Sequence, residues 1–208
     1  MKSKVFLFGY SGHARVVCDI LLSQGYDLAG YFTESPVENN TYELLYCGFE
    51  EELSSLAIIE KHSYFVAVGS NSIRKKISVT LFNQKGMYPC NAIAISAILS
   101  PKIRIGYGVM AGPASVINSG STIGNGVICN TACIIEHECN IGDYVHVAPG
   151  AILCGNVTVG ENSFIGAGSV IKEGIIIGKN VTIGAGTVVL QNIEDGKTVV
   201  GNPQRIIR

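Results

Sequence analysis

Two kinds of hydrophobic periodicity divide the chain near residue 90. In the first part, three short apolar runs predict strands at residues 5–9, 28–32 and 64–69. Apolar positions three and four residues apart predict helices at residues 14–22, 50–61 and 73–81, with Gly25 and Gly86 ending the first and the third. Because strands and helices alternate, residues 1–92 are expected to form a small α/β domain with a parallel, Rossmann-like sheet.

The second part, residues 93–208, follows a period of six. Fifteen consecutive hexads run from residue 99 to residue 188, and thirteen of their first positions hold Ile, Leu or Val. The fifth position always holds a small or β-branched residue. Three hexads close a triangular turn, whose strands pair in parallel with the next turn at a spacing of about 4.8 Å. The period therefore predicts a parallel β-helix of five coils.

Charge and composition narrow the class of protein. The chain has 15 Lys and Arg against 16 Asp and Glu, which argues against a nucleic-acid partner because a polyanion needs clustered positive charge. Charged residues make up 15% and hydrophobic residues 47%, so part of the surface is expected to be buried against other subunits. No apolar run approaches the roughly 20 residues that span a bilayer, and no signal peptide is visible, so we expect a cytoplasmic protein without a membrane span.

The cysteines give no metal signature. Seven cysteines occur without any CxxC pair, and their spacing matches no common zinc pattern. We therefore expect free, buried thiols in a reducing compartment and no metal site.

His137 is the candidate that the coil arithmetic singles out. Positions 119, 137, 155 and 173 follow one another at intervals of three hexads, so they stack along one corner of the prism, with His137 pointing outward below Gly155. Two interpretations stay open, a solvated polar corner or a general base. An imidazole with a pKa near 6.5 can take a proton from an amine or a hydroxyl, and the adjacent Glu138 would favour the imidazolium. His146, nine positions further on, falls on a different face.

The turn at residues 9–13 is the second candidate. It follows a strand and opens a helix, which is the geometry of a phosphate cradle. It is not a complete dinucleotide fingerprint, because Ser11 and Ala14 stand where glycines are required. Gly69 and Asn71, after the third strand, are expected at the same carboxyl edge of the sheet.

These motifs resemble a known family. The hexads resemble those of the hexapeptide-repeat acyltransferases. Residues 8–17 and 130–142 resemble the sialic acid O-acetyltransferases and the nucleotide-4-amino-sugar N-acetyltransferases, in particular the UDP-4-amino-sugar type of bacillosamine synthesis. The resemblance implies a left-handed prism, a homotrimer, and acetyl-CoA bound in the groove between neighbouring prisms.

The resemblance also implies roles for individual residues. It implies a catalytic group made of His137 as the base, Glu138 and Asn130. It implies acetyl-CoA contacts at His146, Gly155, Ala167, Ala185 and Gly201. It implies nucleotide-sugar contacts at Ser11, Gly12, His13, Thr33, Glu34, Gly69 and Asn71.

The expected function is acetyl-CoA-dependent N-acetylation of the 4-amino group of a nucleotide-linked 4-amino-4,6-dideoxy sugar, with UDP favoured. Thr33 and Glu34 replace an acidic pair of the bacillosamine-type enzymes, so dTDP- and GDP-linked amines stay open. O-acetylation of sialic acid is the alternative reaction. A zinc lyase on the same helix would need three His ligands, whereas the prism holds only His137 and His146. A non-catalytic scaffold or sugar sensor would not need His137.

Overall fold

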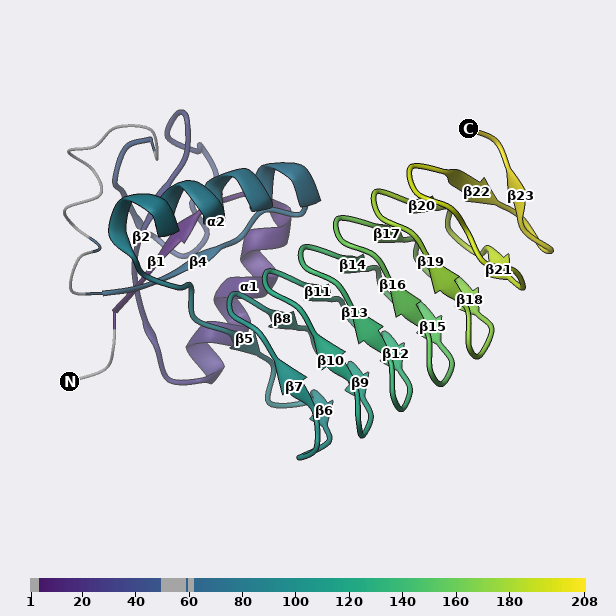
Figure 1. Cartoon of the computed structure of the whole chain (residues 1–208). Helices are drawn as coiled ribbons and strands as arrows, with labels where there is room; N and C mark the ends of the chain where they lie inside the picture. The colour runs from purple at the N-terminus through teal and green to yellow at the C-terminus, as the bar shows by residue number, and fades with distance from the viewer. Residues whose placement is uncertain (1–3, 50–58, 60–61) are drawn as a thin grey trace.

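The computed structural model describes residues 4–49, 59 and 62–208, which form an α/β domain followed by a β-helix (Figure 1). The expected fold class, a parallel α/β domain and a left-handed β-helix of hexapeptide repeats, is confirmed. The expected helix at residues 50–61 lies outside the described residues. The expected division after residue 92 falls inside β5, the first strand that pairs with the β-helix.

In the described residues, the α/β domain has a parallel sheet with strand order β3-β2-β1-β4 and two helices. Its elements are β1 (Lys4–Phe8), α1 (Gly12–Ser23), β2 (Asp27–Phe32), β3 (Leu45–Tyr46), β4 (Ser63–Val66) and α2 (Asn71–Lys85). Gly86 ends α2 in the left-handed conformation, with a φ of 63°. The short strand β3 was not predicted, because so short a strand carries no periodic pattern.

The two helices cover opposite faces of this sheet. Residues of α1 such as Ala14 and Val17 pack between the sheet residues Val5 and Leu7 and the first coils of the β-helix. On the other face, Ile77 and Leu81 of α2 pack against the aromatic residues of the sheet. The helix α1 is therefore the layer that joins the α/β domain to the β-helix.

The β-helix has three sheets. The docking face, on which α1 packs, consists of β5 (Ala92–Ile93), β8 (Met110–Ala111), β11 (Ile128–Cys129), β14 (His146–Val147), β17 (Phe164–Ile165), β20 (Thr182–Ile183), β22 (Thr198–Val200) and β23 (Arg205–Ile206). The aliphatic face consists of β6 (Ile98–Leu99), β9 (Val116–Ile117), β12 (Ile134–Ile135), β15 (Ile152–Leu153), β18 (Val170–Ile171) and β21 (Val188–Val189). The polar face consists of β7 (Arg104–Ile105), β10 (Thr122–Ile123), β13 (Asn140–Ile141), β16 (Thr158–Val159) and β19 (Ile176–Ile177).

Successive coils pair in a register of three hexads, as predicted. Ile128 of β11 pairs with Met110 on one side and with His146 on the other. From β9 to β21, the second residue of each strand points into the prism, where the first-position aliphatic residues form one continuous core. The coil also extends beyond the fifteen hexads, because β5 pairs with β8 before them and β22 pairs with β20 after them.

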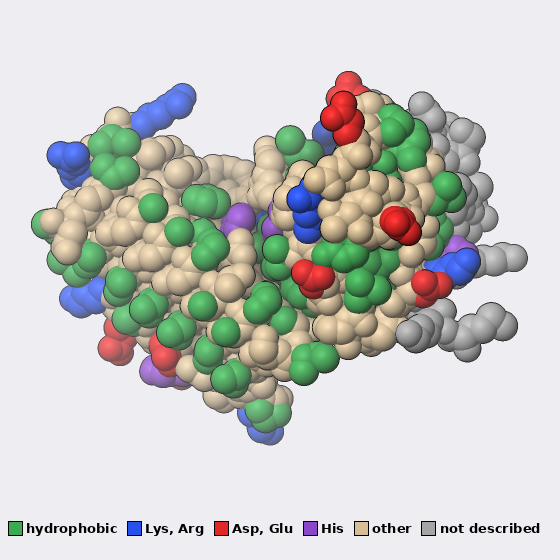
Figure 2. Space-filling view, turned by 180° about the vertical axis from the view of Figure 1, so that it is seen from behind, with side chains coloured by type: hydrophobic (Ala, Val, Ile, Leu, Met, Phe, Trp, Pro, Cys, Tyr) green, Lys and Arg blue, Asp and Glu red, His purple; other side chains and the backbone are tan. Residues whose placement is uncertain are grey.

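The outer sides of the faces differ in chemistry. The aliphatic face presents Ile98, Val116, Ile134, Ile152, Val170 and Val188. The polar face presents Arg104, Thr122, Asn140, Thr158 and Ile176. The side of the β-helix in view in Figure 2 carries many apolar and few charged side chains. Among the described residues, no helix has the length and hydrophobicity needed to cross a bilayer.

Candidate functional site

Two loops at the carboxyl edge of the α/β sheet form one side of the candidate site. The β1–α1 loop holds Gly9 to Ser11, directly before Gly12 and His13 in the first turn of α1, and the β4–α2 loop holds Ala67 to Ser70. The two loops pass so closely that a Cβ on Gly9 would lie 2.5 Å from Val68 Cγ2, and Gly9 has a φ of +88°. Only glycine permits both features at this position. Both helices therefore start side by side and aim their N-termini at the same edge, which favours an anion there.

The β-helix contributes His146 to this edge. His146 points outward from β14, and its ring centroid lies 6.4 Å from that of His13, at the start of α1. Phe164 on the next coil packs edge-on against the His146 ring at 5.0 Å. Figure 2 shows histidine side chains at the cleft between the two lobes of the molecule. A single chain thus brings together His13, which is expected to contact the nucleotide sugar, and His146, which is expected to contact acetyl-CoA.

Asn130 determines the tautomer of His146. The Thr131 N–H donates to Asn130 Oδ1 at 2.8 Å, which turns Asn130 Nδ2 toward His146 Nε2 at 3.1 Å. Because the amide nitrogen donates, Nε2 accepts and Nδ1 carries the proton of the neutral ring. His146 Nδ1 and His13 Nε2 are buried without a hydrogen-bond partner in the described part of the chain. These two ring atoms therefore lack a well-formed hydrogen bond, and His146 interacts only weakly with the backbone of Gly69, which acts to raise its pKa.

The electrostatics of the junction keep both rings neutral. Burial lowers the pKa of His146 to about 4, and the positive charge of Arg74 lowers it further, with His13 adding a smaller effect. Burial and Arg74 likewise lower the pKa of His13 to about 4. Neutral imidazoles act as hydrogen-bond donors and acceptors at neutral pH, and these two cannot balance the charge of a phosphate.

His137 lies on the corner between the aliphatic and polar faces. Its side chain is 56% exposed, and its Nδ1 lies 3.2 Å from Glu138 Oε2. The stacking predicted from the period of three hexads is present, because Glu138 N donates to Ser119 O and Asn156 N to His137 O. A Cβ on Gly155 would lie 2.5 Å from His137 Cε1, so a larger residue at this position would displace the ring from the orientation that it has here.

The remaining candidates are spread over several places. Ala167 and Ala185 are exposed and stack on the corner between the docking and aliphatic faces, and Gly201 lies in the tail that covers the last coil. Ser11, at the end of the β1–α1 loop, and Gly12, the first residue of α1, are exposed. Thr33 and Glu34 follow β2 at the same sheet edge, where Gly9 N donates to Phe32 O.

The catalytic group implied by the resemblance is not assembled within one chain. Asn130 contacts His146, whereas His137 and Glu138 lie across the aliphatic face from that pair. The side chain of Asn71 is engaged by the β-helix, because its Nδ2 donates to Asn162 O and Ser163 O at 3.1 Å. No cluster of three or more His, Cys, Asp or Glu side chains that could hold a metal ion occurs in the part of the chain that the structure describes.

Arg74 is the residue at this junction to which the sequence assigned no role. It is 1% exposed and donates to oxygens of both domains. The only signal in the sequence was its position beside the helical stripe of Ile73, Ile77 and Leu81, which does not reveal a buried cation.

Comparisons with known protein families agree with this architecture. Residues 4–81 match the PglD N-terminal domain. Residues 138–173 match the bacterial transferase hexapeptide (six repeats), and residues 156–191 match the hexapeptide repeat of succinyl-transferase.

Solved structures match over nearly the whole chain. The acetyltransferase domain of PglB from Neisseria gonorrhoeae, in complex with acetyl coenzyme A, is 33% identical and superposes with a TM-score of 0.91 over 100% of both chains. A His-to-Asn mutant of perosamine N-acetyltransferase from Caulobacter crescentus, in complex with CoA and GDP-perosamine, is 32% identical over 99% of this chain and 97% of that one, with a TM-score of 0.93. WeeI from Acinetobacter baumannii is 29% identical over 98% and 99%, with a TM-score of 0.85.

An α/β domain joined to a β-helix of hexapeptide repeats defines the class of the hexapeptide-repeat acyltransferases. Within this class, the chain belongs to the family of sugar N-acetyltransferases that have a PglD-type N-terminal domain, which confirms the resemblance found in the sequence. A curated relative, an uncharacterized protein of Acanthamoeba polyphaga mimivirus, is 33% identical over 115 residues. The match spans 54% of this chain and only 22% of the length of that relative.

The low pKa of His146 predicts acid sensitivity. The unfolded chain binds the proton with a pKa near 6.5, whereas the folded chain binds it near 4. Between these values the unfolded state holds more protons, so stability falls as the pH falls. We expect the free energy of unfolding, from urea titrations at pH 7 and pH 5, to fall less for His146→Gln than for the wild type, by on the order of 1–2 kcal/mol.

Ile128→Val is the matched control for this experiment. Ile128 pairs with His146 on the neighbouring strand but does not titrate, so its substitution lowers stability by a similar amount at both pH values. An unchanged pH dependence in His146→Gln would contradict the buried, neutral ring.

Proposed function

We propose that this chain transfers an acetyl group from acetyl-CoA to the 4-amino group of a nucleotide-linked 4-amino-4,6-dideoxy sugar, with UDP as the nucleotide. The observation that carries the proposal is the match over the full chain length to PglB and perosamine N-acetyltransferase, one solved with acetyl coenzyme A and the other with CoA and a nucleotide sugar. Both substrates are cytoplasmic metabolites, so we place the reaction in the cytoplasm.

The reaction needs one base and one donor to the oxyanion. His137 takes a proton from the sugar ammonium, and Glu138, 3.2 Å from its Nδ1, stabilises the imidazolium that forms. That first proton passes from His137 to solvent, and the free amine attacks the thioester carbonyl. His137 then takes the second proton from the nitrogen of the tetrahedral intermediate, the C–S bond breaks, and this proton passes to the departing CoA thiolate, which leaves the neutral amide. The backbone N–H of Gly155, next to the His137 ring, is the proposed donor to the oxyanion.

A homotrimer would assemble this site. The six outward residues of the aliphatic face form an apolar stripe along the prism, as buried subunit interfaces do. This stripe lies between the corner of His137 and the corner of Ala167 and Ala185. If neighbouring prisms bury the stripe, His137 of one copy comes to face Asn130 and His146 of the next.

The acceptor is tested with purified protein, acetyl-CoA and a panel of sugars, by following the release of free thiol. The panel contains UDP-, dTDP- and GDP-linked 4-amino-6-deoxy sugars and free sialic acid. We expect the highest kcat/KM for UDP-4-amino-4,6-dideoxy-GlcNAc. A preference for a dTDP- or GDP-linked amine would overturn the choice of nucleotide, and a preference for sialic acid would overturn the amine acceptor.

His137→Ala is expected to lower kcat by roughly 10²–10⁴, the usual contribution of a positioned acid–base group. The KM for acetyl-CoA should change little in His137→Ala, because the His137 ring acts on the acceptor amine. His146→Ala should mainly raise the KM for acetyl-CoA. His62→Gln, a histidine outside the site, is the control and retains wild-type turnover. Near-normal turnover in His137→Ala would refute the base assignment.

The trimer is tested by static light scattering at micromolar concentration. Wild type should have the mass of three chains, and Ile134→Glu should dissociate it because the interface would bury an unpaired carboxylate. Asn140→Glu on the exposed polar face is the matched control and stays trimeric. A monomeric wild-type protein would rule the assembly out.

A further inference from the structure

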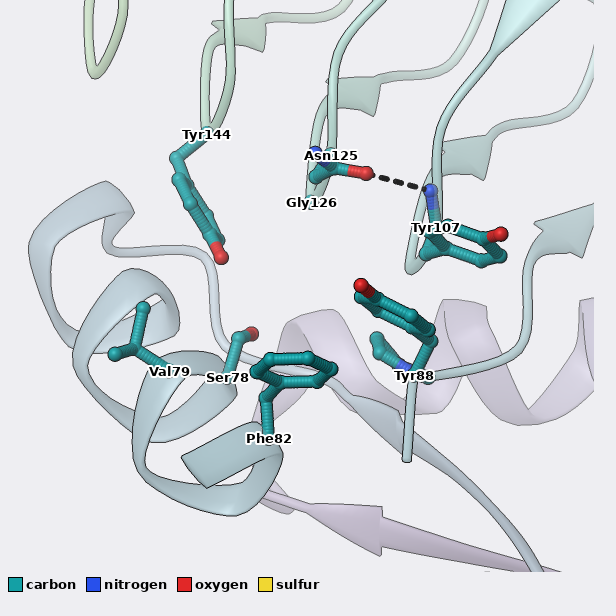
Figure 3. Close-up of a pocket in the computed structure, with 9 residues that line it drawn as sticks. Ser78, Val79, Phe82, Tyr88, Tyr107, Asn125, Gly126 and Tyr144 are labelled. Atoms are coloured by element: carbon teal, nitrogen blue, oxygen red, sulfur yellow. Dashed lines mark hydrogen bonds between the residues drawn. The ribbon is translucent and has the colours of Figure 1, made fainter. Parts of the chain in front are cut away.

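The helix α2 lies along the corner between the polar and docking faces. Figure 3 shows this contact from the side of a small cavity of about 130 Å³, where Ser78, Val79 and Phe82 of α2 face the turns of Gly126 and Tyr144. The first turn of α2 continues the same contact toward the site, and its polar residues bind the backbone of these turns.

The corner offers α2 a ladder of carbonyl groups. Gly126, Tyr144 and Asn162 occupy the same position on three successive coils, and their φ values of 61°, 57° and 62° are left-handed. Arg74 Nε donates to Gly126 O at 2.7 Å, and Arg74 Nη2 donates to Tyr144 O at 3.0 Å. Asn71 Nδ2 donates to Asn162 O at 3.1 Å. Two residues of α2 thus bind three consecutive coils.

The same guanidinium also binds the β4–α2 loop. Arg74 Nη1 donates to Val68 O at 3.0 Å and to Gly69 O at 3.1 Å, and Nη2 donates to Asn71 Oδ1 at 2.9 Å. Val68 in turn lies against Gly9 of the β1–α1 loop, which leads into the first turn of α1 and its His13. Arg74 is therefore the point at which both loops of the α/β domain are connected to the corner of the β-helix.

All five oxygens that accept from Arg74 are uncharged. A buried cation held by carbonyl and amide oxygens alone is tolerated only when its donors are well satisfied. The planar fork of arginine reaches in several fixed directions at once, whereas the single nitrogen of lysine does not. The arrangement is specific to arginine and to the spacing between the loop and the corner.

We propose that Arg74 is a positioning residue for acetyl transfer, which holds the Gly69 and His13 side of the acceptor site at a fixed distance from His146 and Asn130. The inference rests on the proposed function for its kinetic part. Its structural part, the coupling of the β4–α2 loop to the β-helix corner, stands on the contacts alone.

The test uses Arg74→Gln and Arg74→Lys in the full chain. We expect Arg74→Gln to lower kcat/KM for the acceptor sugar by about 10²-fold, because a displacement near 1 Å is enough for such a loss. The KM for acetyl-CoA should stay within about threefold of wild type, because the β-helix keeps its own register. Arg74→Lys should also lower kcat/KM for the acceptor sugar, because the single lysine nitrogen cannot reach the carbonyl groups of Val68 and Gly126 together.

Lys75→Gln is the matched control. Lys75 is the next residue of α2 and also bridges to the β-helix, but through a part-buried ion pair with the side chain of Glu161 rather than through the carbonyl groups of the loop. Its substitution should leave both kinetic constants unchanged. An equal rise in both KM values for the Arg74 variants, or wild-type kinetics in them, would overturn the proposal.

Hydrogen exchange separates this proposal from the proposed function. Without any substrate, amides of residues 67–71 should exchange at least about tenfold faster in Arg74→Lys than in the wild type and in Lys75→Gln, because exchange reports local opening. Exchange at the wild-type rate in Arg74→Lys would contradict the coupling of the β4–α2 loop to the β-helix corner, whatever substrate the enzyme acetylates. If the wild-type protein acetylates none of the sugars, the proposed function is wrong. The exchange rates then still decide whether Arg74 couples the β4–α2 loop to the β-helix corner.

Discussion

The register between successive coils, in which each residue pairs with the one three hexads later, is the constraint on which the rest of the molecule depends. Nearly every strand of the β-helix is a single pair of residues, so no strand is stable without its neighbours above and below. A slip by one residue would turn the interior Ile and Val side chains outward and the polar ones inward. The register is therefore strongly determined, and it determines which side chains share a corner.

Because the register is strict, three corners with similar left-handed turns present three different sets of chemical groups. One presents the small residues Ala167 and Ala185, one presents His137 beside Gly155, and one presents carbonyl groups to α2. The faces between them differ in the same way. The docking face receives the α/β domain through α1, whereas the core clusters of the described residues place no helix against the aliphatic face.

The sequence was sufficient where the periodicity alone decides the geometry. The contact of His137 with Gly155 and the placement of His146 on another face follow from counting residues, and both are confirmed. The approach of His13 to His146 could not be predicted, because it depends on how α1 packs on the docking face. The bond between Asn130 and His146 joins neighbouring coils, but it depends on side-chain conformations that the period does not determine. Arg74 left no charge pattern in the sequence, since its partners are backbone oxygens rather than acidic side chains.

The junction between the α/β domain and the β-helix contains polar groups that are not needed to hold the two domains together. Apolar packing of similar volume stabilises a contact at least as well as a buried charge, and α1 already supplies such packing. Beside this packing lie the buried guanidinium of Arg74 and the neutral imidazoles of His13 and His146. Each of the two imidazoles has one ring nitrogen without a hydrogen-bond partner among the described residues. Buried polar atoms without partners lower the stability of a fold. Their concentration at one sheet edge, where two helices begin, is what a site built to receive a polar ligand requires.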